Sequence, residues 1–205
     1  MKYEFYRELI ITDDFSIFDF ISNGKNGRIN KRIAFSATKL SHVYNLAFGD
    51  INEEGEIDDY IISDNGDRNK ILAIVVKVVD DYTKKFPDRL MFFKGSTRER
   101  TRLYRMAVGL NLEELSVNFN IYAYAEDGLK PFAKNMEINA FVIKRKKLNF
   151  TIMKKSFKIK SYLFKKKITY TIDENLNKLK GKVLAPKKLA EANEMLSKLK
   201  TPLPK

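Results

Sequence analysis

The segment DNGDRNK, from Asp64 to Lys70, contains residue types that could bind a phosphate group. A turn that leads into a helix presents free backbone amides and the positive end of the helix dipole. Arg68 and Lys70 could add charge-assisted hydrogen bonds to phosphate oxygens. The sequence therefore predicts a site for a phosphate or pyrophosphate, formed by Asn65, Gly66, Asp67, Arg68, Asn69 and Lys70.

Arginines follow one face of a second predicted helix, which begins near Thr97. Arg98, Arg102 and Arg105 are separated by four and three residues, so a helix places them on the same side. Guanidinium groups that gather on one face are suited to an anionic ligand. The alternative is that they form salt bridges with the acidic segment 53–59, and the sequence leaves both open.

Tyr104 lies in the same helix and could act as a general acid, because a phenol beside a thiolate can pass it a proton. The alternative is that Tyr104 only packs against the core. The single histidine, His42, has no acidic neighbour in sequence, and we interpret it as structural.

The basic residues are concentrated in the last third of the chain. The protein has a net charge of +13, and residues 144–205 contain 19 Lys and Arg against 4 acidic residues. Such a surface could bind nucleic acid or an acidic protein, with aromatic residues between the lysines available to stack on bases. The alternative is a solvated basic face without a partner. The candidate residues are Lys144, Arg145, Lys146, Lys147, Lys154, Lys155, Lys158, Lys160, Lys165, Lys166 and Lys167.

Several kinds of chemistry are excluded by composition. The chain has no cysteine and one histidine, so we expect no disulfide, no Cys nucleophile and no metal site. Asp58 and Asp59 are adjacent on a predicted strand and would point to opposite faces, and Asp64 and Asp67 fit turn positions. No apolar run is long enough to span a bilayer and no secretory signal is present, so we expect a cytoplasmic protein.

The periodicity of apolar residues predicts an α/β (α+β) fold with a mostly antiparallel sheet and two main helices. We expect two units, an α/β domain at residues 1–140 and a basic β hairpin with a terminal helix at 141–205. The first main helix lies between Asp67 and Pro87, and the second starts with a capping box of Ser96 and Glu99 and ends at Gly109. Strands are predicted at 3–11, 28–37, 43–49, 57–62, 89–94, 117–125, 139–143, 146–153, 156–164 and 168–172, and the terminal helix at 186–199.

The motifs YNLAFGD, SDNGD and GSTRERTRLYR resemble those of an uncharacterised bacterial family of unknown function. More distantly, antiparallel strands, a helix that opens from a Gly turn, a strand and a helix with Arg-Leu-Tyr resemble the core of a GNAT N-acetyltransferase. That resemblance implies acetyl coenzyme A as cofactor, with its pyrophosphate on residues 65–70 and Tyr104 protonating the departing thiolate. The turn differs from the GNAT pattern because it has one glycine, Gly66, and two flanking aspartates that would oppose a pyrophosphate.

Two functions therefore remain open from the sequence. The first is an acyl-coenzyme A-dependent N-acyltransferase of GNAT type or a degenerate relative. The second is a non-catalytic basic module that binds nucleic acid or an acidic partner, as in a phage-conflict or toxin–antitoxin locus. The oligomeric state is open, and an amphipathic terminal helix is also compatible with a dimer.

Overall fold

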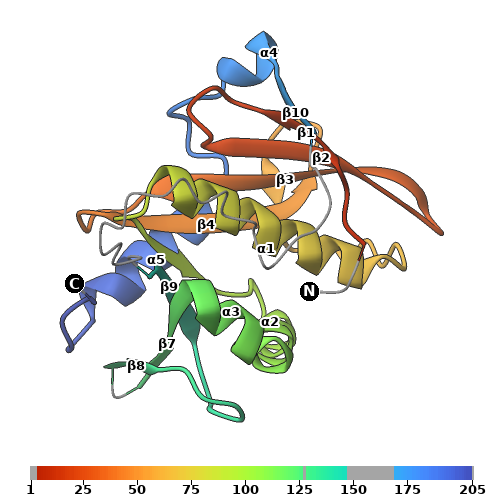
Figure 1. The fold of residues 1–205 in the computed structure, drawn as a ribbon. Helices are drawn as coiled ribbons and strands as arrows, with labels where there is room; N and C mark the ends of the chain where they lie inside the picture. The colour runs from red at the N-terminus through yellow and green to blue at the C-terminus, as the bar shows by residue number, and fades with distance from the viewer. Residues whose placement is uncertain (1–3, 127, 147–168, 205) are drawn as a thin grey trace, which may run out of the picture.

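A computed structural model describes residues 4–126, 128–146 and 169–204 of the 205-residue chain. These residues form a mixed α/β structure on one large open sheet with helices on both faces (Figure 1). In chain order the elements are β1 (Glu8–Ile11), β2 (Ile17–Gly24), β3 (Gly27–Ala37), β4 (Val43–Ile51), β5 (Ile57–Asp58), α1 (Arg68–Lys85), β6 (Leu90–Phe93), α2 (Arg98–Leu110), α3 (Leu112–Asn118), β7 (Phe119–Ala125), β8 (Gly128–Pro131), β9 (Ala140–Arg145), β10 (Thr169–Ile172), α4 (Glu174–Asn177) and α5 (Pro186–Ser197).

The strand order is β10-β1-β2-β3-β4-β6-β9-β7-β8, and the short β5 pairs with β4. Strands β1 to β4 form an antiparallel meander. The chain then crosses over through α1, so that β6 lies parallel to β4. Strand β9 lies between β6 and β7 and is antiparallel to both. The predicted mixed α/β class with a mostly antiparallel sheet is confirmed.

Strands β4 and β6 pair over three of the four residues of β6, which are matched with the first three residues of the longer β4. Val43 is opposite Leu90, and the pairing ends where Asn45 is opposite Phe92. Strand β4 continues to Ile51 and stays paired with β3 on its other side. On the β6 side, no other described strand pairs with it until β5 pairs with its last two residues. The central strands therefore separate along much of β4.

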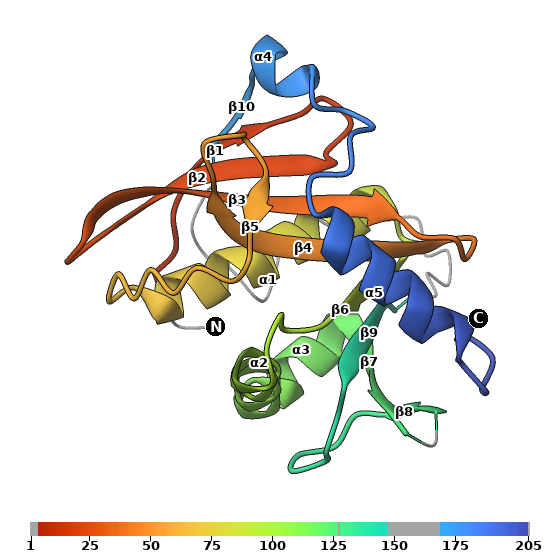
Figure 2. The ribbon, with the colours of Figure 1, turned by 180° about the vertical axis from the view of Figure 1, so that it is seen from behind.

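Helices α1 and α5 cover opposite faces of the sheet, as the two views in Figures 1 and 2 show. Ile74 of α1 belongs to one buried cluster with Phe18 of β2. Ala192 and Leu196 of α5 belong to another with Phe92 of β6. The predicted terminal helix is thus confirmed, and its apolar stripe packs on the sheet formed by the preceding part of the chain.

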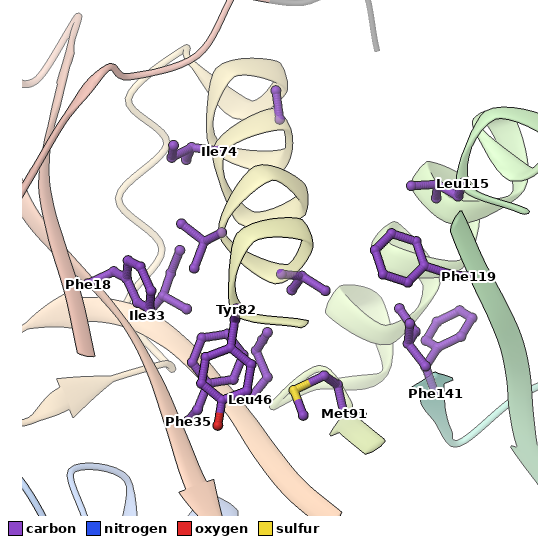
Figure 3. Close-up of a cluster of buried hydrophobic side chains, with 14 of the residues drawn as sticks. Phe18, Ile33, Phe35, Leu46, Ile74, Tyr82, Met91, Leu115, Phe119 and Phe141 are labelled. Carbon is purple, nitrogen blue, oxygen red and sulfur yellow. The ribbon is translucent and has the colours of Figure 1, made fainter. Parts of the chain in front are cut away.

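The main core lies between α1, the sheet and the start of β7 (Figure 3). Tyr82 stacks on Phe35 with ring centroids 3.7 Å apart. Its hydroxyl accepts a hydrogen bond of 2.6 Å from Arg89 Nη1, so the buried phenol is satisfied. Helix α1 is therefore held to the sheet at its C-terminal end by packing and by a polar contact.

The second main helix differs from its prediction at both ends. Its N-cap is Thr97, whose hydroxyl accepts from Arg100 N at 3.3 Å, whereas Ser96 Oγ donates to Asp59 O at 2.5 Å. The predicted capping box of Ser96 and Glu99 is therefore not formed: the N-cap lies one residue later, the third helical residue is Arg100, and Ser96 contacts a distant loop. Gly109 does not end the helix, since α2 continues to Leu110 and is followed directly by α3.

Other differences concern strand lengths. The strand predicted at 57–62 is reduced to β5, and residues 59–67 form a connection to α1. The strand predicted at 3–11 is confirmed only as β1. Of the basic strands, 168–172 is confirmed as β10, which pairs in parallel with β1. The strands predicted at 146–153 and 156–164 lie outside the described residues, apart from residue 146.

Candidate functional site

A cavity of about 1090 Å³ lies between α1 and α2, next to the separated strands β4 and β6. Its volume is similar to that of sites for cofactor-sized molecules. Its walls are mainly apolar, because both helices turn a helically spaced set of side chains toward it. These are Ile71, Leu72, Val75, Val76 and Val79 from α1, and Leu103, Tyr104, Ala107 and Val108 from α2.

The N-terminus of α1 and Arg100, in the first turn of α2, line one end of the cavity. This end, the rim, consists of Lys25, residues 64–70 and Arg100. Arg100 Nη2 donates to Ile61 O at 2.5 Å and Nη1 donates to Ser96 Oγ at 3.1 Å. Arg100 therefore ties the start of α2 to the loop that leads into α1. The positive end of the α1 dipole and the cationic side chains of the rim favour an anion at this end of the cavity.

The predicted phosphate-binding turn is held by its own asparagine. Asn65 is buried, and its Nδ2 donates to Ser22 Oγ at 2.8 Å and to Gly27 O at 3.1 Å. Its Oδ1 accepts from Asn26 N at 2.8 Å. Gly66 has φ +80°, which favours glycine at that position. The Asn65 side chain thus fixes the turn to the β2–β3 hairpin instead of facing a ligand.

The carboxylate of Asp67 is also held by the protein. Its Oδ2 accepts from the Tyr6 hydroxyl at 2.5 Å and from Ser22 Oγ at 2.7 Å. Burial and the bond to Asp67 raise the pKa of the Tyr6 phenol, which stays a donor. The first bond of α1 runs from Ile71 N to Asp67 O, so the amides of residues 68–70 precede the helical ladder. Asp67 therefore does not cap these amides, which agrees with the absence of a side-chain cap.

The other acidic groups at the rim are paired with lysines. Asp64 Oδ2 lies 2.6 Å from Lys25 Nζ, and this contact lowers the pKa of Asp64. Lys70 Nζ lies 3.7 Å from a carboxylate oxygen of Glu4. Arg68 is exposed. The rim therefore contains both charges, with the cations in excess.

A buried ion pair lies beside the rim, where β3 and β4 contribute to the cavity. Lys31 Nζ donates to Asp50 Oδ1, and both side chains are nearly inaccessible to solvent. The same ammonium donates to Ser63 Oγ at 2.8 Å. These contacts satisfy the lysine within the protein and bring the loop before α1 close to the sheet.

Tyr104 lines the cavity one helical turn beyond Arg100. Its ring packs edge-on against Phe93 with centroids 6.2 Å apart. Burial raises the pKa of the Tyr104 phenol, so the group is protonated at neutral pH. Among the residues that the structure describes, its hydroxyl has no hydrogen-bonding partner. The geometry therefore presents a protonated phenol to the cavity, which is what a proton donor requires.

The three arginines predicted as an anion site lie away from the cavity. Arg98 and Arg102 are exposed, and Arg105 Nη1 donates to Met136 O at 3.0 Å. In the described part of the chain, none of them pairs with residues 53–59. The anion site at these arginines stays a prediction. Arg100, which the spacing argument left out, is the arginine that lines the cavity.

The basic C-terminal face lies mostly outside the described residues. Of its predicted members, only Lys144, Arg145 and Lys146 are described. Lys144 is buried in β9, and the guanidinium of Arg145 donates to the Asp80 carboxylate and to Thr83 Oγ1. Lys146 is exposed. Nucleic-acid or acidic-protein binding by this face stays a prediction.

The described ranges contain neither a metal-binding cluster nor a membrane-spanning helix. No group of three or more His, Asp or Glu side chains there could hold a metal ion. No helix there has both the length and the apolar character needed to cross a bilayer. His42 is exposed at a left-handed turn position with φ 63°.

A buried contact joins α5 to the loop that continues into the rim. Lys188 Nζ donates to Asp59 Oδ2 at 2.7 Å, with 6% and 11% of the two side chains exposed. Burial lowers the pKa of Lys188, and Asp59 opposes this shift. Sequence reasoning missed this pair because residues 59 and 188 are far apart, and only an isolated lysine on the apolar face of α5 could have indicated it.

Comparison with protein families gives a match over residues 2–146 to a family model described as a family of unknown function, DUF6934. The match includes the YNLAFGD, SDNGD and GSTRERTRLYR motifs and every element that lines the cavity. No curated protein and no solved structure matches the chain.

Proposed function

The chain belongs to the DUF6934 family, and we propose that it binds an acyl-coenzyme A in the cavity between α1 and α2 and transfers the acyl group to an amine. The observation that carries the proposal is the cavity itself. It is apolar along the two helices and cationic at the rim, where both helices begin. A molecule with an acyl-pantetheine arm and a phosphate end has the same division of polarity.

The order of elements supports the proposal. The resemblance to GNAT N-acetyltransferases rests on antiparallel strands, a helix after a Gly turn, a strand and an Arg-Leu-Tyr helix. In this chain those elements are β1 to β4, α1, β6 and α2. The helix with the Gly turn and the helix with Tyr104 are also the two that enclose the cavity.

The rim can accept phosphate groups despite its two aspartates. Asp64 is paired with Lys25, and Asp67 is turned toward the hydroxyl groups of Tyr6 and Ser22, which hold its carboxylate in place without neutralising its charge. Arg68 and the amides at the start of α1 provide donors for phosphate oxygens. The carboxylates that the sequence places beside the turn therefore oppose an anion less than the sequence suggests.

Tyr104 would supply the proton for the leaving group. The nitrogen lone pair of a neutral amine attacks the thioester carbonyl carbon, a C–N bond forms and the C–S bond breaks. The sulfur takes the proton of the Tyr104 hydroxyl, and the proton lost by the amine nitrogen restores the phenol. The products are an amide and the free thiol. Such a proton transfer contributes on the order of 10²–10⁴ to the rate.

Isothermal titration with coenzyme A tests the binding part of the proposal. Arg100→Ala is expected to weaken the affinity about 10- to 100-fold, because a charge-assisted hydrogen bond is worth roughly 1.5–3 kcal/mol. Arg102→Ala is the matched control, since Arg102 is exposed on the same helix and does not line the cavity. It is expected to leave the affinity unchanged.

Thermal unfolding and thiol release provide the remaining readouts. Coenzyme A at about 100 times its dissociation constant should stabilise the fold by about 2.7 kcal/mol, which corresponds to roughly 5–10 °C. Thiol release from acetyl coenzyme A with a mixture of primary amines and lysine peptides should fall about 100-fold in Tyr104→Phe. No binding heat and no stabilisation at millimolar coenzyme A would disprove the proposal.

A further inference from the structure

The polar and apolar lining of the cavity is segregated along its length. Every polar lining residue belongs to Glu4, residues 23–31, Asp50, residues 63–70, Arg100 or Tyr104. The remaining lining from α1, α2, α3, β7 and β9 is apolar throughout. Tyr104 marks the boundary on α2, because Arg100 lies one turn before it and the apolar residues follow it.

The apolar end, termed the chamber, is built from elements beyond the rim. Its residues are Val79, Ala107, Val108, Leu115, Phe119, Ile121 and Ile143. From Arg68 at the rim to Val79, α1 rises about 16 Å at 1.5 Å per residue. Apart from Ala107, these side chains also belong to the main buried cluster, so the chamber is the end of the cavity that borders the core.

Water is a poor occupant of the chamber. A buried water needs two to four polar partners, and the side chains of the chamber offer none. An unfilled apolar space forfeits dispersion contacts of its lining. An acetyl group attached at the level of Tyr104 has one methyl group to offer, which is too small to contact chamber side chains from five elements.

We propose that the chamber binds an unbranched acyl chain of about six carbons or more, so that the substrate is a medium- or long-chain acyl group instead of acetyl. The inference rests on the proposed function for the position of the thioester. Two kinds of ligand carry such an acyl chain, a coenzyme A thioester and a free fatty acid. The cationic rim would accept the phosphate groups of the first or the carboxylate of the second.

The test is a calorimetric series with coenzyme A, acetyl-, hexanoyl- and decanoyl-coenzyme A, and decanoate. Burying one methylene contributes about 0.8 kcal/mol, or a factor of about four in affinity. Hexanoyl- should therefore bind more than about 100-fold more tightly than acetyl-coenzyme A. Equal affinities of the acetyl, hexanoyl and decanoyl thioesters would overturn the inference.

The arms of the series separate this inference from the proposed function. Tighter binding of longer thioesters supports both the acyl chain in the chamber and the proposed binding of acyl-coenzyme A. Binding of decanoate without binding of coenzyme A or any thioester supports the chamber and overturns acyl-coenzyme A as its source. Binding of coenzyme A without dependence on chain length overturns the chamber and leaves the proposed function intact. No binding in any arm overturns both.

Filling the chamber provides a variant test. Ala107→Phe, or the smaller change Ala107→Leu if the first variant does not fold, should weaken decanoyl-coenzyme A at least tenfold more than acetyl-coenzyme A. Ala190→Phe is the matched control, because Ala190 is exposed on α5 and outside the cavity. It should leave both affinities unchanged. An equal loss for the two thioesters in the Ala107 variants would contradict an acyl chain in the chamber.

Discussion

Asp59→Asn is expected to destabilise the protein by about 3–5 kcal/mol, because it leaves the ammonium group of Lys188 buried without its counter-charge. Lys188 Nζ donates to Asp59 Oδ2 at 2.7 Å, and 6% and 11% of the side chains are exposed. At that burial, solvent screens the pair weakly, so the small values measured for exposed salt bridges do not apply. The pair joins α5 to the loop that continues into the rim.

Thermal and urea unfolding, followed by circular dichroism, measure this loss. At roughly 2–4 °C per kcal/mol for a chain of this size, the melting temperature should fall by roughly 6–20 °C. Adding Lys188→Met to Asp59→Asn should recover most of the stability, because the unpaired charge is then removed. Lys198→Met is the control, since Lys198 forms an exposed pair with Glu194 on the same helix.

The loss should also depend on pH. Burial lowers the pKa of Lys188, so between its folded and unfolded pKa values the folded protein binds fewer protons than the unfolded chain. The contribution of Lys188 to stability therefore improves as pH rises through the folded pKa toward about 10.4. Without Asp59, the pKa of Lys188 in the folded protein falls further. The destabilisation caused by Asp59→Asn should therefore be smaller at alkaline than at neutral pH. This account would be refuted if the effects of Asp59→Asn and Lys188→Met on stability were additive. It would also be refuted if the destabilisation by Asp59→Asn grew with pH.

Two further predictions concern the framework of the site. Asn65→Ala removes four hydrogen bonds and should cost about 2–3 kcal/mol in urea unfolding, whereas Asn69→Ala, at an exposed position of the same segment, should change little. Equal effects would mean that the backbone alone holds the turn. Arg145→Leu removes one of the two cations, Arg145 and Lys84, that pair with the fully buried Asp80 in the described part of the chain, and it should cost about 3–5 kcal/mol. A smaller loss than for Lys84→Met would show that Arg145 is not the main counter-charge.

The main helices could be predicted from sequence because their signals are local. The apolar spacing from Ile71 to Tyr82 requires only neighbouring residues to be interpreted, and α1 was expected within a few residues of its bounds. The same reasoning failed at Gly109, because α2 continues to Leu110 and it is the side chain of Asn111 that donates back to Ala107 O at 2.8 Å. It also chose Ser96 as the cap, whereas a contact with the distant loop at Asp59 engages that hydroxyl.

The candidate site was predictable in part. The turn and Tyr104 were identified as functional candidates from residue type and position, and both line the cavity. Arg100 was missed because the argument selected arginines that share an outer face, whereas a cavity residue faces inward. The roles of Asn65 and Asp67 in holding the turn depend on Ser22, which is more than 40 residues away in sequence.

By itself the sequence determined the fold class, the two main helices, the terminal amphipathic helix and the lack of cysteine chemistry, since composition and periodicity are properties of the chain alone. Only the tertiary structure decided that β4 and β6 separate, that an apolar chamber lies between α1 and α2, and that Lys188 meets Asp59. These features arise from strand pairing and side-chain packing between distant segments. Neighbouring residues do not encode which distant groups they meet, so local patterns could not reveal them.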